Sequence, residues 1–336
     1  MFSFSLPTIT LATGAASSPG MLVVGLAEAQ DGDLLVGLPD DLAKATNKAL
    51  GTDVLSLAKE IGASPKTGTC VLLALPGGVR LVVAGIGPID VTAEHVRRAS
   101  GAALRLIAGL PSAKPHEVTL SLETTELTII KGAAEGALLG SYRYGPSKPE
   151  TPGIGAITLI TPSRKTDAKQ ALELAVVTAE AVIQARDWVN TSANLLYPET
   201  FVESARALTK GTKVNLEVWD DKALERDGFG GILAVGGGST RKPRLLKVAY
   251  APRGARFHLA LVGKGITFDA GGLDIKTAEG MYTMKCDMAG AASVIAAVHA
   301  IAKLGLRIQV TAWAALAENL PSGSAYRPSD VLTMFN

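Results

Sequence analysis

Short apolar runs alternate with stretches of helical periodicity along the whole chain. Runs at 21–26, 71–75 and 81–85 have the length of buried strands, and residues 92–108 have apolar side chains spaced as on a helix. Short continuous apolar runs between turn residues are typical of strands inside a sheet, and spacings of three and four residues indicate helices. Alternation of the two predicts an α/β fold.

The alternation continues into the second half of the chain. Further strands are predicted at 118–122, 156–160, 214–218, 245–250, 259–262 and 308–313, and helices at about 124–139, 167–190 and 289–303. A chain of 336 residues is longer than one typical core. We therefore place a domain boundary just before the longest helical pattern. This predicts an N-terminal α/β domain over 1–165 and a second domain over 166–336.

Composition narrows the class of protein. Hydrophobic residues form 47% of the chain and charged residues 19%, which is the balance of a packed globular protein. The 33 basic and 31 acidic side chains nearly cancel, so the overall charge favours neither nucleic acid nor a membrane surface as a partner and leaves open only a local basic patch. Cys70 and Cys286 are too few for a disulfide framework, and the N-terminus lacks the pattern of an export signal. A cytoplasmic location fits these features.

Two acidic and two basic residues follow the strand predicted at 259–262. Lys264 and Asp269 lie in the glycine-rich stretch directly after that strand, and Lys276 and Asp287 come before the helix predicted at 289–303. Functional loops of α/β sheets lie at the carboxyl ends of strands. We expect these four side chains to converge there.

Each of these residues also has an ordinary structural interpretation. Asp287 could cap the helix that follows it and complement the helix dipole. Lys264 and Lys276 could be solvated surface lysines, and the glycines around Lys264 could mark only a tight turn. The functional interpretation therefore depends on the four residues taken together.

Three segments resemble the catalytic core of the leucyl aminopeptidases, in the cytosol aminopeptidase family. They read GKGITFD at 263–269, DIK at 274–276 and MKCDMAGAA at 284–292. Flanking segments, ARDWVNT at 185–191, ENLPSG at 318–323 and YRPSDV at 326–331, resemble further signatures of that family. The resemblance is clear over 166–334, whereas the N-terminal part shares only the general order of strands and helices.

The resemblance implies a fold and an activity. It implies a smaller, macro-like N-terminal α/β domain followed by a three-layer α/β/α metallopeptidase domain. The implied activity is the release of N-terminal amino acids, preferably leucine, from peptides by water that two metal ions activate. Family members of this kind form homohexamers, which we expect of the full-length protein.

The resemblance also assigns roles to residues. It implies that Lys264, Asp269 and Asp287 bind two divalent ions, Mn²⁺ or Zn²⁺, with Asp269 between them. Lys276 would contact the substrate or the transition state, and Met284 would line the pocket for the first residue of the peptide. These residue types suit the chemistry, because paired divalent ions need shared oxygen ligands. A lysine can bind a metal ion only as the neutral amine, which an adjacent dication favours.

Other candidate ligands fall outside the motif. None of the four histidines, His95, His116, His258 and His299, lies within it, which argues against a histidine zinc site. Cys286 adjoins Asp287, but consecutive residues at the start of a helix point in different directions. The glycines at 236–238 lack the lysine and hydroxyl residue of a phosphate-binding loop, so we interpret them as a flexible turn.

The sequence departs from the family at two places. Ala270 stands where serine is common. After Met334 the family continues with an Asn-Thr-Asp-Ala-Glu-Gly-Arg-Leu stretch that supplies an Asp ligand, a Glu ligand and a catalytic Arg, whereas this sequence ends at Asn336. The resemblance therefore implies an incomplete catalytic domain, and we expect the chain alone to be weakly active or inactive.

Two alternatives to an active enzyme stay open. One is a catalytically dead fragment or scaffold that keeps only the ability to associate. The other is an architectural DNA-binding role, which some family members have, through Arg97 and Arg98 or through the basic segment 241–244. The near balance of charge argues against DNA binding.

Overall fold

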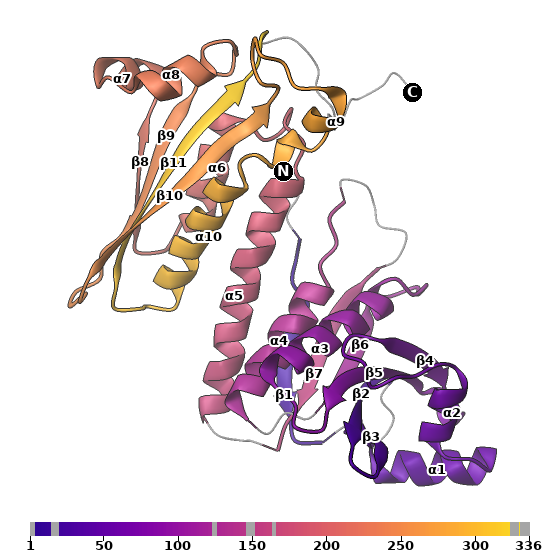
Figure 1. Ribbon diagram of the computed structural model, residues 1–336. Helices are drawn as coiled ribbons and strands as arrows, with labels where there is room; N and C mark the ends of the chain where they lie inside the picture. The colour runs from indigo at the N-terminus through magenta and orange to yellow at the C-terminus, as the bar shows by residue number, and fades with distance from the viewer. Residues whose placement is uncertain are drawn as a thin grey trace. The chain divides into compact units, whose positions relative to one another are not determined.

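The computed structural model describes residues 4–14, 20–122, 126–145, 152–162, 166–322 and 329. The described chain forms two compact units. The first runs from Ser5 to Ala179, and the second contains Phe4 and the residues from Glu180 onward. Figure 1 shows the elements of each unit. Both units are built from strands and helices in alternation, so the predicted α/β class is confirmed.

The first unit is built on a seven-stranded sheet within the described residues, in the order β1-β7-β6-β2-β5-β4 with β3 paired to β2. Its strands are β1 (Thr8–Ala12), β2 (Met21–Ala29), β3 (Gly32–Val36), β4 (Cys70–Ala74), β5 (Arg80–Pro88), β6 (His116–Ser121) and β7 (Ile154–Ile160). The helical segments are α1 (Asp40–Leu50), α2 (Val54–Glu60), η1 (Pro76–Gly78), α3 (Ala93–Ala108), α4 (Leu127–Gly140) and the first part of α5 (Thr166–Asn190). The pairs β1–β7, β7–β6, β6–β2 and β2–β5 are parallel. β3 pairs antiparallel with β2, and β4 pairs antiparallel with β5.

Both faces of this sheet are covered by helices. Along β2, Val23 and Ala27 pack with α3, α4 and the first part of α5, whereas Leu22, Val24 and Leu26 pack with α1 and α2. A parallel strand buried on both faces reads as a continuous apolar run, because alternate side chains enter different cores. This explains why the run at 21–26 shows no polar alternation.

The second unit is built on a four-stranded sheet within the described residues, in the order β10-β11-β9-β8. Its elements are α6 (Pro198–Thr209), β8 (Val214–Trp219), α7 (Asp221–Arg226), α8 (Gly230–Gly236), β9 (Arg244–Tyr250), β10 (His258–Asp269), α9 (Ala278–Met281), η2 (Met284–Cys286), α10 (Ala289–Lys303) and β11 (Gln309–Asn319). The strands β10 and β11 are parallel, and β9 runs antiparallel to both β11 and β8.

One face of the second sheet carries the core of this unit. Side chains of α10, α6 and the end of α5 pack there, with Trp188 and Phe201 among the fully buried ones. On the opposite face Trp219 of β8 contacts Phe229, the residue before α8, at a ring distance of 6.5 Å. Helices therefore lie against both faces of the sheet, with the larger core on the α10 side.

The chain passes from the first unit to the second inside α5, between Ala179 and Glu180. The N-terminal part of this helix contributes Ala168 and Ala175 to the core of the first unit, and its last turns contribute Trp188 to the core of the second. One continuous helix thus takes part in both cores. The domain boundary that we predicted between 165 and 166 stays a prediction.

The strand predicted at 259–262 is longer in the structure than its apolar run, so the predicted end of this strand was wrong. β10 continues through the glycine-rich stretch to Asp269, so Lys264 lies within a strand and not in a loop after it. Gly263 and Gly265 are needed for close packing. A Cβ on Gly263 would lie 2.6 Å from the carbonyl carbon of Gly290, and one on Gly265 would lie 2.7 Å from the Ala315 oxygen. These glycines mark close approach of backbones.

The two cysteines form no disulfide, and burial raises the pKa of the Cys70 thiol to about 11. One helical stretch of the described chain, Ala278–Lys303, is long and apolar enough to cross a membrane by length and composition. It includes α10, whose residues Ala291, Ile295 and Val298 are buried against the sheet. Packing in the core accounts for the apolar character of α10.

Candidate metal and catalytic site

Asp269 is the last residue of β10 and lies opposite Asn319, the last residue of β11. A register shift between Ile266 and Phe268 precedes this pair, and the strands remain paired through it. The Ala270 amide then donates to the Asn319 carbonyl over 2.9 Å, which keeps the two strand ends together. The carboxyl ends of two parallel strands therefore place Asp269 at the edge of the sheet where functional groups of α/β proteins gather.

The Asp269 carboxylate has a partner on each oxygen. Oδ1 accepts hydrogen bonds from the Asn319 side-chain amide at 2.8 Å and from the Gly271 backbone amide at 3.0 Å. Oδ2 lies 2.5 Å from the Lys276 ammonium. Burial opposes ionisation of this carboxyl group, but the three donors outweigh burial and lower the pKa of Asp269. Asp269 is held as a carboxylate.

The loop after β10 returns Lys276 to the strand end. Gly271 and Gly272 have φ values of +89° and +72°, in the region that residues with a side chain rarely adopt. The Lys276 backbone amide donates to the Ala270 carbonyl over 3.0 Å, which closes the loop beside Asp269. The predicted proximity of Lys276 and Asp269 is thus a consequence of a short, glycine-dependent loop.

Asp287 reaches the same region from the segment before α10. Its carbonyl accepts a hydrogen bond of 3.2 Å from the Ile266 amide on the outer edge of β10. This contact places the Asp287 side chain next to Lys264, whose ammonium lies 3.0 Å from Asp287 Oδ2. Lys264 remains largely exposed, with 61% of its side-chain surface accessible, whereas Asp287 is mostly covered.

The electrostatic environment of Asp287 differs from that of Asp269. Burial raises the pKa of Asp287, the nearby charge of Asp269 adds to this effect, and the Lys264 ammonium offsets only part of it. Within the described chain, the buried Oδ2 of Asp287 accepts no hydrogen bond, although Lys264 is close to it. The charged partner of this buried oxygen is thus the Lys264 ammonium.

The donor chemistry fits a divalent cation in part. Asp269 and Asp287 offer hard oxygen ligands, and Lys264, 3.0 Å from Asp287 Oδ2, offers a nitrogen ligand if it is neutral. The described residues contain no cluster of three or more His, Cys, Asp or Glu side chains placed to hold a metal ion. The described chain therefore supplies part of a ligand set.

Met284 begins η2, between Lys276 and Asp287 in the chain. It packs, partly buried, against a small apolar cluster that contains Phe268 and Ala270. The sequence predicted Met284 as a lining residue of a substrate pocket. The structure places it next to the end of β10, and its contact with substrate stays a prediction.

Two neighbouring residues were not predicted. Asn319 contacts Asp269 directly, and Lys285 donates from Nζ to the Asn190 carbonyl at the end of α5 over 3.0 Å. Lys285 thereby anchors the segment that carries Asp287. Asn319 lies in the ENLPSG segment quoted above, but its long-range partner has no local sequence signal. The last residue of the ENLPSG segment and all of the YRPSDV segment except Ser329 lie outside the described residues, as does the chain after it.

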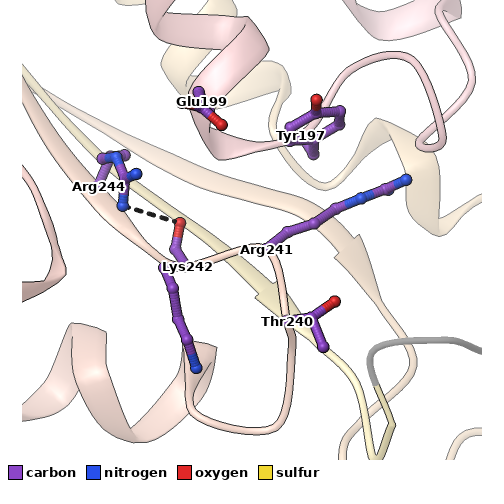
Figure 2. Close-up of a pocket in the computed structure, with 6 residues that line it drawn as sticks. All are labelled: Tyr197, Glu199, Thr240, Arg241, Lys242 and Arg244. Atoms are coloured by element: carbon purple, nitrogen blue, oxygen red, sulfur yellow. Dashed lines mark hydrogen bonds between the residues drawn. The ribbon is translucent and has the colours of Figure 1, made fainter.

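The basic segment 241–244 lines a pocket of about 260 Å³. Figure 2 shows its lining: Tyr197 and Glu199 at the start of α6, Thr240, Arg241 and Lys242 from the turn before β9, and Arg244, the first residue of β9. Arg241 contacts the buried Glu318 at 3.2 Å and lies over the Tyr197 ring at 4.4 Å. Arg244 contacts Asp221 and nearby carbonyls. The arginines are thus engaged within the protein.

The other basic pair proposed for DNA binding lies on α3. Arg97 forms two hydrogen bonds, of 2.7 and 2.8 Å, with the Glu94 carboxylate. A guanidinium held by a carboxylate has less capacity to bind phosphate. In each basic segment, therefore, at least one arginine is engaged by a carboxylate of the protein itself.

Comparison with protein families matched both parts of the chain. Residues 23–150 match the N-terminal domain of the cytosol aminopeptidase family, and residues 183–336 match its catalytic domain. The "probable cytosol aminopeptidase" of Cutibacterium acnes is 46% identical over 325 residues, which cover 96% of this chain and 63% of that protein. The protein of the same name from Streptomyces avermitilis is 40% identical over 354 residues, covering 98% of this chain and 68% of that protein.

A solved structure of the bottromycin maturation enzyme BotP in complex with Mn is also similar. It is 29% identical, with a TM-score of 0.73, and the match covers 93% of this chain and 62% of that one. The chain thus spans about two thirds of the length of the proteins that it matches. The match includes both units.

Proposed function

The chain belongs to the cytosol aminopeptidase family, and we propose that it carries part of the active site of a metal-dependent aminopeptidase. The proposed reaction releases N-terminal amino acids, preferably leucine, from peptides. The proposed cofactors are two divalent ions, Mn²⁺ or Zn²⁺, and the Mn-bound BotP structure is consistent with manganese. A cytoplasmic location and a hexamer of the full-length protein belong to the same proposal.

One observation carries this proposal. Two carboxylates from different segments converge at one end of β10, and each lies beside a lysine. Burial and the nearby Asp269 charge raise the pKa of Asp287, which a surface ion pair does not require. A helix cap would direct the aspartate to backbone amides. The arrangement favours a cation site over the ordinary structural interpretations.

The proposed roles follow from the surroundings of each residue. Asp269 and Asp287 would hold the cations, with Lys264 as a nitrogen ligand. When bound, the cations supply Lewis acidity and make hydroxide available from water near neutral pH. Lys276 would stay charged and stabilise the oxyanion that develops from the scissile carbonyl. Met284 would contact the side chain of the first residue of the peptide.

The test uses the product of the complete reading frame, with Mn²⁺ or Zn²⁺ added. We expect release of p-nitroaniline from leucine p-nitroanilide, and a fall in kcat of at least about 100-fold in Lys276→Ala, because a donor to a developing oxyanion is typically worth that much. Asp269→Ala should lose activity through loss of metal. Lys222→Ala, which changes an exposed lysine on α7, is the matched control.

Circular dichroism of each variant separates loss of activity from loss of folding. Unchanged turnover in both folded variants, Lys276→Ala and Asp269→Ala, would overturn the assignment. A series of p-nitroanilides with other first residues measures the preference for leucine. If the complete protein is folded and inactive on all of them, the scaffold alternative is favoured.

A further inference from the structure

We propose that Asn319 is a positioning residue that fixes the Asp269 carboxylate for binding a divalent cation. Its amide, together with the Gly271 backbone amide, holds Oδ1 and so limits how the carboxylate can turn. This inference rests on the metal site of the proposed function. It adds a residue outside the predicted ligands and substrate contacts.

The geometry around Oδ1 carries the first step. Asn319 Nδ2 donates to Oδ1 over 2.8 Å and the Gly271 amide donates over 3.0 Å. Two donors on one oxygen limit rotation of the carboxylate about its last bond. Oδ2 has only Lys276 as a hydrogen-bond partner among the described residues. The two oxygens of Asp269 are thus differentiated by their surroundings, as a metal ligand held in one orientation requires.

The position of Asn319 is itself constrained from three sides. Its carbonyl accepts the Ala270 amide at 2.9 Å. A Cβ on Gly272 would lie 2.8 Å from Asn319 Oδ1, so a glycine at this position leaves room for the amide. The preceding residue, Glu318, is fully buried and is held by Ser239 at 2.6 Å and Arg241 at 3.2 Å. The end of β11 is therefore anchored where it meets Asp269.

The residue type suits this task. An asparagine amide donates a hydrogen bond without bringing a charge, so it orients Asp269 without competing electrostatically with a cation. A lysine or arginine at this position would neutralise the carboxylate, and an aspartate would repel it. Loss of residues that orient metal ligands typically weakens metal binding about 10- to 100-fold.

The test measures Mn²⁺ binding to the full chain by electron paramagnetic resonance of free and bound Mn²⁺. We expect Asn319→Leu, which keeps the approximate volume and removes the donor, to weaken binding about 10- to 100-fold. Asn319→Ala, a smaller change at a partly exposed position, serves if the leucine variant fails to fold. Asn215→Leu is the matched control, because Asn215 also donates to a carboxylate, Glu217 Oε1 at 3.1 Å, elsewhere in the same sheet.

Two further arms separate this inference from the proposed function. The unsubstituted chain should bind Mn²⁺, and Asp269→Asn should abolish that binding. If both hold but the folded Asn319 variants bind within twofold of the unsubstituted chain, the role of Asn319 is wrong and the metal site stands. If the unsubstituted chain binds no Mn²⁺, or Asp269→Asn binds it equally well, the metal site fails and the inference fails with it.

The metal-free melting temperature provides the readout that separates positioning from a purely structural role. A positioning role predicts weakened Mn²⁺ binding in variants whose melting temperature stays close to that of Asn215→Leu. The proposal is overturned if weaker Mn²⁺ binding is found only in an Asn319 variant with a lowered melting temperature, while the Asn319 variant with an unchanged melting temperature binds Mn²⁺ normally.

Discussion

Asp269 and Asp287 have the same side chain and lie near each other, yet their pKa values shift in opposite directions. Asp269 accepts hydrogen bonds from Lys276, Asn319 and a backbone amide, and these outweigh burial. Asp287 is also partly buried, and the Lys264 ammonium offsets only part of the effect of burial and of the nearby Asp269 charge. The ionised Asp269 therefore stabilises the fold, whereas the ionised Asp287 destabilises it.

This difference predicts opposite effects of two isosteric substitutions on the metal-free chain. At pH 7 Asp287→Asn should raise the free energy of unfolding. The folded pKa of Asp287 lies above its unfolded value, so the gain should shrink as the pH falls through the folded pKa and vanish below the unfolded value of 3.8. Urea unfolding with a chelator present, at pH 7 and below pH 4, measures the difference.

The comparison is with Asp269→Asn, which should lower stability at pH 7. The folded pKa of Asp269 is depressed, so its contribution is present above the unfolded value of 3.8 and is lost as the pH falls through the folded pKa. Equal effects of the two substitutions at pH 7 would show that their surroundings do not differ as described.

The contact between β10 and α10 determines where the site residues lie. Gly263 on the strand faces the start of the helix at Gly290, and a Cβ on Gly263 would lie 2.6 Å from that backbone. The same strand carries Lys264, and the segment before the helix carries Asp287. Close packing of these two elements therefore controls the distance between the two side chains.

Gly263→Ala should destabilise the second unit by about 1–3 kcal/mol, the range for inserting a methyl group into a packed interior. The clash is with backbone atoms, which cannot rotate away. Gly231→Ala is the control, because Gly231 lies within α8 with nothing within 4 Å of an added Cβ, and alanine should slightly stabilise that helix. Urea unfolding of both variants provides the comparison, and equal stability of both would contradict the close contact.

At the scale of the whole molecule, the chain has two compact units with separate cores, and α5 contributes to each. All 3 tryptophans, Trp188, Trp219 and Trp313, lie in the second unit. Tryptophan fluorescence therefore reports on that unit alone, while circular dichroism reports on both. Separate cores predict that a core substitution in one unit lowers the stability of that unit first.

Trp188→Ala should destabilise the second unit by about 3–5 kcal/mol. Trp188 is fully buried, its ring centre lies 4.9 Å from that of Phe201, and its indole N–H donates to the Ser204 hydroxyl over 2.8 Å. The fluorescence of the remaining tryptophans should then change at lower urea than before. Leu104→Ala, in the core of the first unit, should shift the circular dichroism signal with little change in the fluorescence midpoint. Coincident shifts by both probes in both variants would show that the units unfold together.

The sequence by itself determined the α/β class, the family and the bounds of the elements with the clearest periodicity. The helix predicted at 289–303 corresponds to α10, because a period set by local backbone geometry is visible in local sequence. The strand predicted at 259–262 was too short, since glycines read as a turn when their packing partner is unknown. The sequence motifs identified the candidate site residues, but not the side chains and backbone groups that contact them.

Only the tertiary structure decided how those residues are surrounded. The partner of Asp269 on Oδ1, Asn319, is 50 residues away, and the two meet because β10 and β11 pair in parallel and in register. The opposite pKa shifts of Asp269 and Asp287 arise from burial and from which donors reach each oxygen. Such contacts join segments distant along the chain, and they depend on packing that no local pattern of residues encodes.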